Sequence, residues 1–320
     1  MDNLIEVKHL KKYFEVRGGF LHAVDDVSFR IEKGKTVGVV GESGCGKSTL
    51  GRVLLHLLDS TDGQIFFEGK DITKVSRKEL SALRKQMQMI FQDPFSSLNP
   101  RMTIYQTIAE PMKIAGGFTP QEIDQRVYEM MDTVGLARRL VNTYPHELDG
   151  GRRQRIGIAR ALVLNPKFIV CDEPVSALDV SIQAQIINLL LDIQEQMGLT
   201  YVFITHDLMV VRYISDEIIV MYLGQIVEKA PSAELFERNL HPYTKALLSA
   251  VPIPDPRKKK ERVALKGELT SPINPAPGCR FAVRCPYAKE VCFKENPKLE
   301  EVSENHFVAC HLVHDEKINK

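Results

Sequence analysis

The sequence has no long apolar segment, no excess of either charge and few cysteines. Its longest apolar runs, residues 168–171 and 218–223, fall far short of the roughly 20 residues that cross a bilayer. Lys and Arg number 42 and Asp and Glu 41, so the formal net charge of +1 disfavours a protein held on nucleic acid by charge alone. Residues 1–14 contain no apolar signal-peptide core. We therefore expect a cytosolic chain that contacts a membrane only through a partner.

The composition is that of an ordinary globular protein. Hydrophobic residues make up 44% and charged residues 26%, which excludes a largely disordered or collagen-like chain. Strand-like residues 36–40 precede a helical segment at 48–58, and strand-like residues 168–171 and 201–205 flank an amphipathic helix that ends at Gly198. This alternation predicts an α/β fold with a mostly parallel sheet.

A helical insertion interrupts this α/β pattern. Pro120 occupies the first position of a predicted helix whose apolar residues recur at helical spacing up to Val134. The proline-rich, basic run at 252–262 is interpreted as a solvated linker. The predicted division is a core at 1–92 and 166–250, a helical subdomain at 93–165, and a linker with a small cysteine-rich tail at 251–320.

Residues 41–49 read GESGCGKST, which matches the phosphate-loop pattern. Glycines let consecutive amide N–H groups point into one concavity that binds phosphate oxygens, and the helix that follows adds the positive end of its dipole. In this pattern Lys47 reaches the β- and γ-phosphates and the Ser48 hydroxyl binds Mg²⁺. The predicted nucleotide-binding residues are Gly41, Glu42, Ser43, Gly44, Cys45, Gly46, Lys47, Ser48 and Thr49.

A second motif, FIVCDEP at 168–174, delivers two adjacent acids at the end of a buried strand. Asp172 is expected to hold Mg²⁺ through water, and Glu173 to polarise the water that attacks the γ-phosphate. A solvated turn would also place two acids side by side. The phosphate loop upstream favours the catalytic interpretation.

Several ordered motifs resemble those of the ATPase subunits of ABC transporters, over roughly residues 4–250. The resemblance implies that Gln92, in FQDP, binds Mg²⁺ and acts in catalysis, and that His206, in ITHD, senses the γ-phosphate. An aromatic residue near the N-terminus is implied to stack on adenine, and Tyr13 and Phe14 are both candidates. The implied fold is a P-loop ATPase core, with a mostly parallel sheet and an antiparallel β subdomain, carrying the inserted helical subdomain.

In this family two ATPase domains pair head to tail, so a signature and a D-loop act on the partner's nucleotide. LDGGRRQR matches the signature, usually LSGGQ, and SALD matches the D-loop with Asp179. Gly150 and Gly151 open a helix whose free N–H groups can approach a γ-phosphate. The implied partner is a second ATPase subunit, either a non-identical sibling or a second copy of this chain.

The signature departs from the family pattern at two positions. Asp149 replaces a serine that donates a hydrogen bond to the γ-phosphate, and an ionised Asp cannot donate. Arg152 replaces glutamine and adds compensating positive charge. Asp149 is also a good helix N-cap. The hypothesis is that this signature is catalytically weak toward nucleotide on the partner.

Three further stretches, at 92–103, 241–252 and 277–292, look like those of oligopeptide and dipeptide importers. The implied role is to power peptide import at the cytoplasmic face of the membrane, with transmembrane permeases and, indirectly, a solute-binding protein as partners. Residues 95–112 are the candidate docking surface for the permeases. Nickel or oligosaccharide import is the near alternative. A soluble ABC protein acting on DNA or ribosomes is the distant one, and no nucleic-acid partner is expected.

Four of the six cysteines lie in the tail with the spacing C-x5-C-x6-C-x17-C. Four soft ligands suit an iron–sulfur cluster or Zn²⁺, and the absence of close C-x2-C pairs favours [4Fe–4S] over zinc. Unligated thiols are the remaining alternative. Disulfides are disfavoured in a reducing compartment. The expected ligands are Cys279, Cys285, Cys292 and Cys310, with His306, His311 or His314 as a substitute for one of them.

Overall fold

The computed structural model describes residues 2–251 and 271–313. The chain forms two compact units, one of residues 1–4, 31–35 and 74–204 and the other of residues 5–30, 36–73 and 205–320. Each unit is described by itself. The basic run at 252–262 lies outside the described residues, and the division into core, helical subdomain and tail stays a prediction.

Three parallel strands form the sheet of the first unit. They are β6 (Met87–Ile90), β7 (Phe168–Asp172) and β8 (Thr200–Ile204), and β7 pairs with both of the others. Every residue of β7 and β8 is buried, as expected for parallel strands covered on both faces. The helices α2 (Arg77–Gln86) and α7 (Val180–Met197) belong to this unit.

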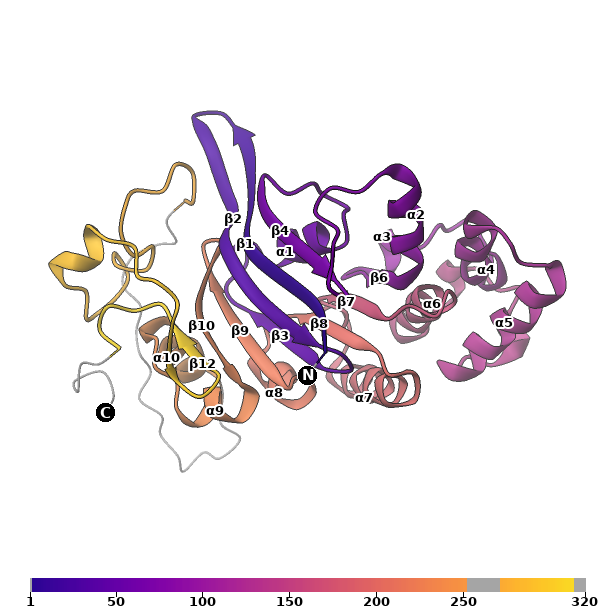
Figure 1. The fold of residues 1–320 in the computed structure, drawn as a ribbon. Coiled ribbons are helices and arrows are strands. Elements are labelled where there is room, and N and C mark those ends of the chain that lie inside the picture. Colours follow the sequence, from indigo (N-terminus) through magenta and orange to yellow (C-terminus); the bar gives the residue numbers. More distant parts are fainter. Residues whose placement is uncertain (1, 252–270, 314–320) are drawn as a thin grey trace, which may run out of the picture. The chain divides into compact units, whose positions relative to one another are not determined.

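The insertion is helical, as predicted (Figure 1). It contains α3 (Pro94–Ser97), α4 (Ile104–Ala115), α5 (Pro120–Thr133), η1 (Arg138–Leu140), η2 (Pro145–Glu147) and α6 (Gly150–Leu162). Thr119 caps α5 in a reciprocal capping box with Glu122, and Thr103 caps α4 in the same way. The apolar face predicted for α5, including Ile123 and Val127, is buried.

The second unit has an antiparallel sheet in the order β2-β1-β4-β5. Its strands are β1 (Asn3–Val16), β2 (Gly19–Glu32), β4 (Asp62–Phe67) and β5 (Lys70–Asp71). In the same unit β3 (Thr36–Val40) pairs in parallel with β9 (Glu217–Tyr222), and β9 pairs antiparallel with β10 (Gln225–Pro231). The prediction of an α/β fold with an antiparallel β part is confirmed.

The C-terminal segment extends this second set of strands. Strand β12 (His306–Val308) pairs with β10 and with β11 (Glu300–Ser303), both antiparallel. The helices of the unit are α1 (Lys47–Leu54), α8 (Leu208–Ile214), α9 (Ser232–Glu237), α10 (Pro242–Ala250) and η3 (Glu290–Phe293). Tail and core are therefore joined by backbone pairing.

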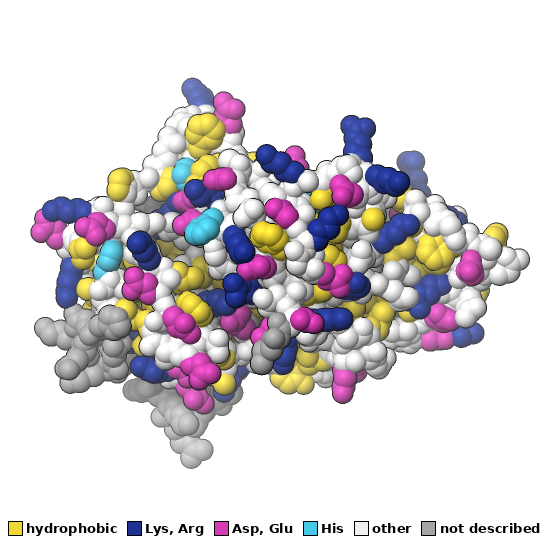
Figure 2. Space-filling model, in the orientation of Figure 1, with side chains coloured by type: hydrophobic (Ala, Val, Ile, Leu, Met, Phe, Trp, Pro, Cys, Tyr) yellow, Lys and Arg dark blue, Asp and Glu magenta, His cyan; other side chains and the backbone are white. Residues whose placement is uncertain are grey.

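Figure 2 shows acidic and basic side chains interspersed on one face, in keeping with the balanced charge of the sequence. In the part of the chain that the structure describes, no helix is both long and apolar enough to span a bilayer.

Candidate nucleotide-binding site

The phosphate loop connects β3 to α1 and depends on glycine at both ends. Gly41 has φ +153° and Gly46 has φ +105°, a region that side chains with a Cβ rarely adopt. A Cβ at Gly41 would lie 2.2 Å from the Met221 carbonyl oxygen, and one at Gly46 would lie 2.0 Å from that of Ala23. The loop can follow this path against its neighbours only with glycine at these two positions.

Lys47 folds back over the loop. Its Nζ donates to the carbonyl oxygens of Gly41 at 2.8 Å and Glu42 at 3.0 Å, and the residue is 5% exposed. Ser48 and Thr49 follow in the first turn of α1, where the helix dipole favours an anion. The predicted cation and the predicted amide cradle therefore occur in the same short segment.

Cys45 has a structural environment. The residue is 1% exposed, and burial raises the pKa of its thiol against the opposing effect of Lys47. Its carbonyl oxygen accepts a hydrogen bond from the Gly224 amide at 2.8 Å. A protonated, buried thiol is a poor nucleophile, so the backbone of Cys45 is the part that serves the loop.

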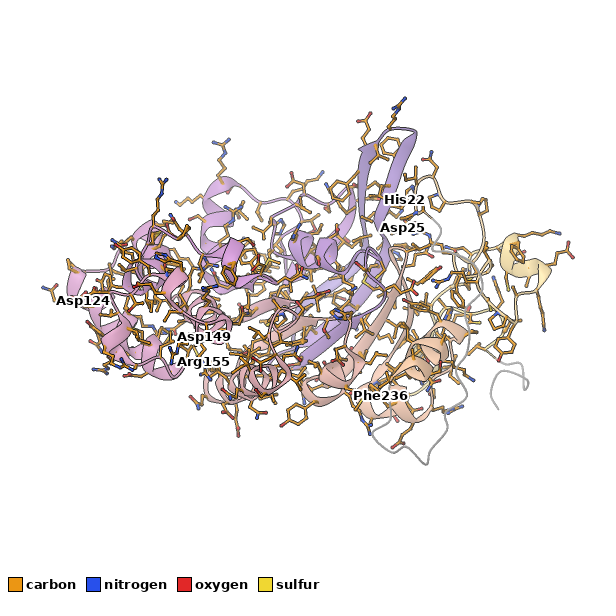
Figure 3. The ribbon with its side chains drawn as sticks, turned by 180° about the vertical axis from the view of Figure 1, so that it is seen from behind. His22, Asp25, Asp124, Asp149, Arg155 and Phe236 are labelled. Atoms are coloured by element: carbon orange, nitrogen blue, oxygen red, sulfur yellow. The ribbon has the colours of Figure 1, made fainter. Side chains whose placement is uncertain are left out.

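The two candidate adenine-stacking residues have different surroundings. Tyr13 stacks on His22, with ring centroids 3.8 Å apart, and its hydroxyl donates to Asp25. Figure 3 labels His22 and Asp25 close together on β2. Burial and the Asp25 carboxylate raise the pKa of the Tyr13 hydroxyl. The Lys12 ammonium lies over the ring of Phe14, and its Nζ is 5.0 Å from the ring centroid. Both residues stay predicted partners of adenine.

In the first unit, two predicted catalytic residues meet at the carboxyl ends of neighbouring strands. Gln92, two residues after β6, donates from Nε2 to Glu173 Oε2 at 2.9 Å. Glu173 directly follows Asp172, the buried last residue of β7. It has φ 47°, and its amide donates to the Ile204 carbonyl at 2.9 Å. A left-handed backbone at a non-glycine residue is often found at functional sites.

The predicted signature and D-loop also lie together. A Cβ on Gly151 would lie 2.7 Å from Ile182 Cγ2, and one on Gly150 would lie 3.1 Å from Leu178 Cδ2. Asp179 caps α7 by accepting from the Ile182 amide at 3.0 Å. The start of α6 is therefore packed closely on the start of α7, and a larger residue at Gly151 would require the Ile182 side chain to move.

Asp149 caps α6, as its residue type predicts (Figure 3). Its Oδ1 accepts from the Arg152 amide at 2.8 Å, and its Oδ2 lies 3.4 Å from Arg152 Nε. Both side chains are more than half exposed. The carboxylate therefore uses one of the amides at the start of α6, the helix end that is expected to approach a γ-phosphate.

His206 lies exposed in the turn that leads into α8. The next residue, Asp207, caps that helix through the amides of Met209 and Val210 at 2.8 and 3.3 Å. Asp207 therefore fixes the turn that carries His206, the histidine predicted to sense the γ-phosphate.

The four tail cysteines lie close enough to influence one another. Burial, and then the other three thiols, raise the pKa of Cys279 to about 12, and burial raises that of Cys310 to about 11. All six cysteines of the chain are free thiols. Among the described residues, however, no three His, Cys, Asp or Glu side chains are grouped so as to hold a metal ion.

The histidines expected near these cysteines have other partners. His306 is fully buried, and its Nε2 lies 2.8 Å from Glu228 Oε1. His311 Nε2 lies 2.8 Å from the Glu295 carbonyl oxygen. His314 lies outside the described residues.

The sequence did not predict two residues that contact the phosphate loop. The Arg284 guanidinium donates to both carboxylate oxygens of Glu42, and the Tyr243 hydroxyl accepts from the Glu42 amide. Tyr243 lies in a stretch noted only for its family resemblance. Arg284 directly precedes Cys285, and the sequence carries no signal that distinguishes it from other basic residues of the tail such as Arg280.

Comparison with known proteins agrees with this geometry. Residues 24–176 match a model described as ABC transporter, and residues 227–292 match one described as oligopeptide/dipeptide transporter, C-terminal region. The oligopeptide transport ATP-binding protein AppF of Bacillus subtilis is 52% identical over 97% of this chain and 98% of its own. OppF of Haemophilus influenzae, a protein of the same description, is 51% identical over 96% of each chain.

Among solved structures, the ATP-binding cassette MJ0796, dimeric in a post-hydrolysis state with ADP and Pi, matches with a TM-score of 0.66. It is 29% identical and covers 71% of this chain and 98% of its own. Fold and motifs together define a P-loop ATPase of the ABC class. The chain belongs to the family of ATP-hydrolysing, ATP-binding proteins of oligopeptide and dipeptide ABC transporters.

Proposed function

We propose that this chain hydrolyses ATP to power the import of dipeptides or oligopeptides, at the cytoplasmic face of a membrane and bound to transmembrane permeases. The observation that carries the hydrolytic role is the hydrogen bond between Gln92 and Glu173, because it holds a carboxylate ready to polarise water. The cargo rests on the peptide-transport descriptions of the similar proteins.

The residues suit the chemistry. Lys47 would neutralise the β- and γ-phosphates, and the loop amides would bind their oxygens. Ser48, Gln92 and Asp172 offer the oxygen donors that Mg²⁺ prefers, and the ion would supply charge neutralisation when bound. Glu173 would orient and polarise water, with Gln92 fixing the carboxylate.

The test uses the chain assembled with its permeases and solute-binding protein in vesicles. Lys47→Ala is expected to abolish both ATP binding and uptake, and Glu173→Gln to keep binding but lose hydrolysis. The surface variant Lys294→Gln is the matched control. Uptake is compared among peptides, nickel and oligosaccharides. A hydrolysis rate unchanged in Glu173→Gln would refute the catalytic role, and uptake of nickel or sugar alone would refute the cargo.

We also propose that the ATPase works as a pair with a non-identical sibling. The support is Asp149, whose carboxylate occupies an amide at the start of α6 and cannot donate to a phosphate. A sibling with an ordinary signature would leave one composite site fully active. A pair of identical chains would carry two weak sites.

The cysteine tail is proposed to hold a [4Fe–4S] cluster, with Zn²⁺ as the alternative. The support is the mutual influence of the four thiols and the small size of the segment, which needs a staple to fold. We propose that the cluster has a structural role and holds the small segment in its fold.

A further inference from the structure

The C-terminal segment contacts the phosphate loop through an ion pair between Arg284 and Glu42. Its Nη1 donates to Glu42 Oε2 at 2.7 Å and its Nη2 to Oε1 at 3.1 Å, the forked geometry of a guanidinium on a carboxylate. The Arg284 side chain is 10% exposed and that of Glu42 is 27% exposed, so water screens the pair little. Because Glu42 directly follows Gly41, this ion pair acts on the loop itself.

The backbone of Glu42 is held as well. Its amide donates to the Tyr243 hydroxyl at 2.8 Å, and its carbonyl oxygen accepts from Lys47 Nζ at 3.0 Å. One residue of the loop is therefore fixed from the tail, from α10 and from the lysine at once. A shift of Glu42 would move an acceptor on which the Lys47 ammonium rests.

An aromatic cluster keeps Arg284 in place. Phe281 is buried and lies 5.2 Å from the ring of Tyr222 and 5.4 Å from that of Tyr243. Its carbonyl oxygen accepts from the Arg284 amide at 3.0 Å, and Arg284 Nη1 lies 3.4 Å from the Tyr222 hydroxyl. Contacts within the protein alone thus hold the arginine in position.

Stability alone explains this burial poorly. Arg284 Nε is buried and has no acceptor among the described residues. Removing charges from water costs free energy that often offsets their attraction, so a buried ion pair is weak evidence of stabilisation. The contact with the phosphate loop is the more direct reason for a buried arginine at this position.

We propose that Arg284 is a positioning residue for ATP binding. It orients Glu42, and through Glu42 the Lys47 ammonium, so that the loop is shaped for triphosphate before the nucleotide arrives. The inference rests on the proposed function, because it needs the loop to bind ATP. It makes the cysteine-rich tail part of the nucleotide site.

The test measures the Kd for MgATP with the full-length chain, and KM and kcat with the assembled transporter. Arg284→Gln is expected to raise Kd and KM about tenfold while kcat changes by less than about twofold. Glu42→Gln is expected to do the same, and the double variant to be no weaker than either single one. Lys294→Gln, which breaks the exposed pair with Glu290 in the same segment, is the control and should change neither constant.

Arg284→Lys keeps the charge without the fork and should recover part of the affinity. It also replaces Arg284→Gln if melting curves show that the latter does not fold. Wild-type Kd and KM in the arginine variants would overturn the inference while leaving the proposed function standing. Additive losses in the double variant would overturn it too. A wild-type chain without affinity for MgATP would overturn the proposed function, and the inference with it.

Discussion

The guanidinium of Arg153 lies over the ring of Phe95, 3.5 Å from its centroid. Arg153 belongs to α6, whose first residues are the signature, and Phe95 belongs to α3, which follows Gln92. Arg153 is buried and its Nε donates to the Pro145 carbonyl oxygen at 2.6 Å, whereas Phe95 is 65% exposed. The ring therefore joins the helix of the signature to the segment proposed to dock the permeases.

Phe95→Ala is expected to uncouple transport from hydrolysis. Stimulation of the assembled ATPase by peptide-loaded solute-binding protein should fall about fivefold, the scale of a coupling contact. The free energy of unfolding should fall by less than about 1 kcal/mol, because the ring is mostly exposed. Phe118→Ala, at another exposed aromatic of the same unit, is the control. Full stimulation in Phe95→Ala would contradict the prediction.

Asp149→Ser is expected to restore the hydrogen-bond donor of the signature. In the assembled transporter the maximal ATPase rate should about double, because a second composite site then contributes. Serine caps a helix as well as aspartate does, so the melting temperature should stay the same. Asp149→Ala separates the effects, since it removes the charge without adding a donor. A rate unchanged across ATP concentrations in Asp149→Ser would argue against a weak signature.

His241 is expected to make stability depend on pH. Burial lowers its pKa from 6.5 to about 4, and its Nδ1 accepts from the Tyr243 amide, so the folded chain holds it neutral. Between these two pKa values the unfolded chain binds more protons than the folded chain does. The contribution of His241 to the free energy of unfolding is therefore complete above pH 6.5 and is lost as the pH falls toward 4. The loss should be on the order of 2 kcal/mol at about pH 4.5.

Urea unfolding at about pH 7 and about pH 4.5 checks this prediction against His241→Asn. Asparagine keeps the cap on α10 without titrating in this range, so the variant should lose less stability on acidification. Equal losses in both proteins would assign the acid sensitivity to groups other than His241.

Anaerobically purified protein is expected to contain iron and labile sulfide. Cys279→Ser or Cys310→Ser should abolish both and lower the melting temperature, whereas Cys45→Ser should keep the iron. Because burial raises the pKa of the Cys279 and Cys310 thiols, loading should release protons and should weaken as the pH falls. Stoichiometric zinc without sulfide would refute the cluster.

Local chemistry made parts of the molecule predictable. The Thr119 and Pro120 start of α5 and the stop of α7 at Gly198, which has φ 64°, follow from residue preferences within one turn. The helix predicted for 48–58 instead ends at Leu54. Beyond Leu54 the amides of Leu57 and Leu58 both donate to the Arg52 carbonyl oxygen. These hydrogen bonds form a turn that the apolar spacing does not predict.

Contacts between distant segments were not predictable in this way. Arg284 and Glu42 are 242 positions apart, and nothing in the local sequence of either one identifies the other. Likewise, the residue type of Asp149 predicts its cap, but only the structure shows that the carboxylate occupies the Arg152 amide. Residue chemistry identified the loop and the acids, and tertiary packing decided what surrounds them.

The pairing of β12 with β10 also affects the tendency of the protein to aggregate. Without the C-terminal strands, β10 would be an edge strand with a row of unpaired amides and carbonyls. Such an edge can pair with other chains and lead to aggregation. With them, the outermost strand is β11, only four residues long, with two exposed glutamates. A version of the protein cut before residue 300 should therefore precipitate even where its phosphate loop is intact.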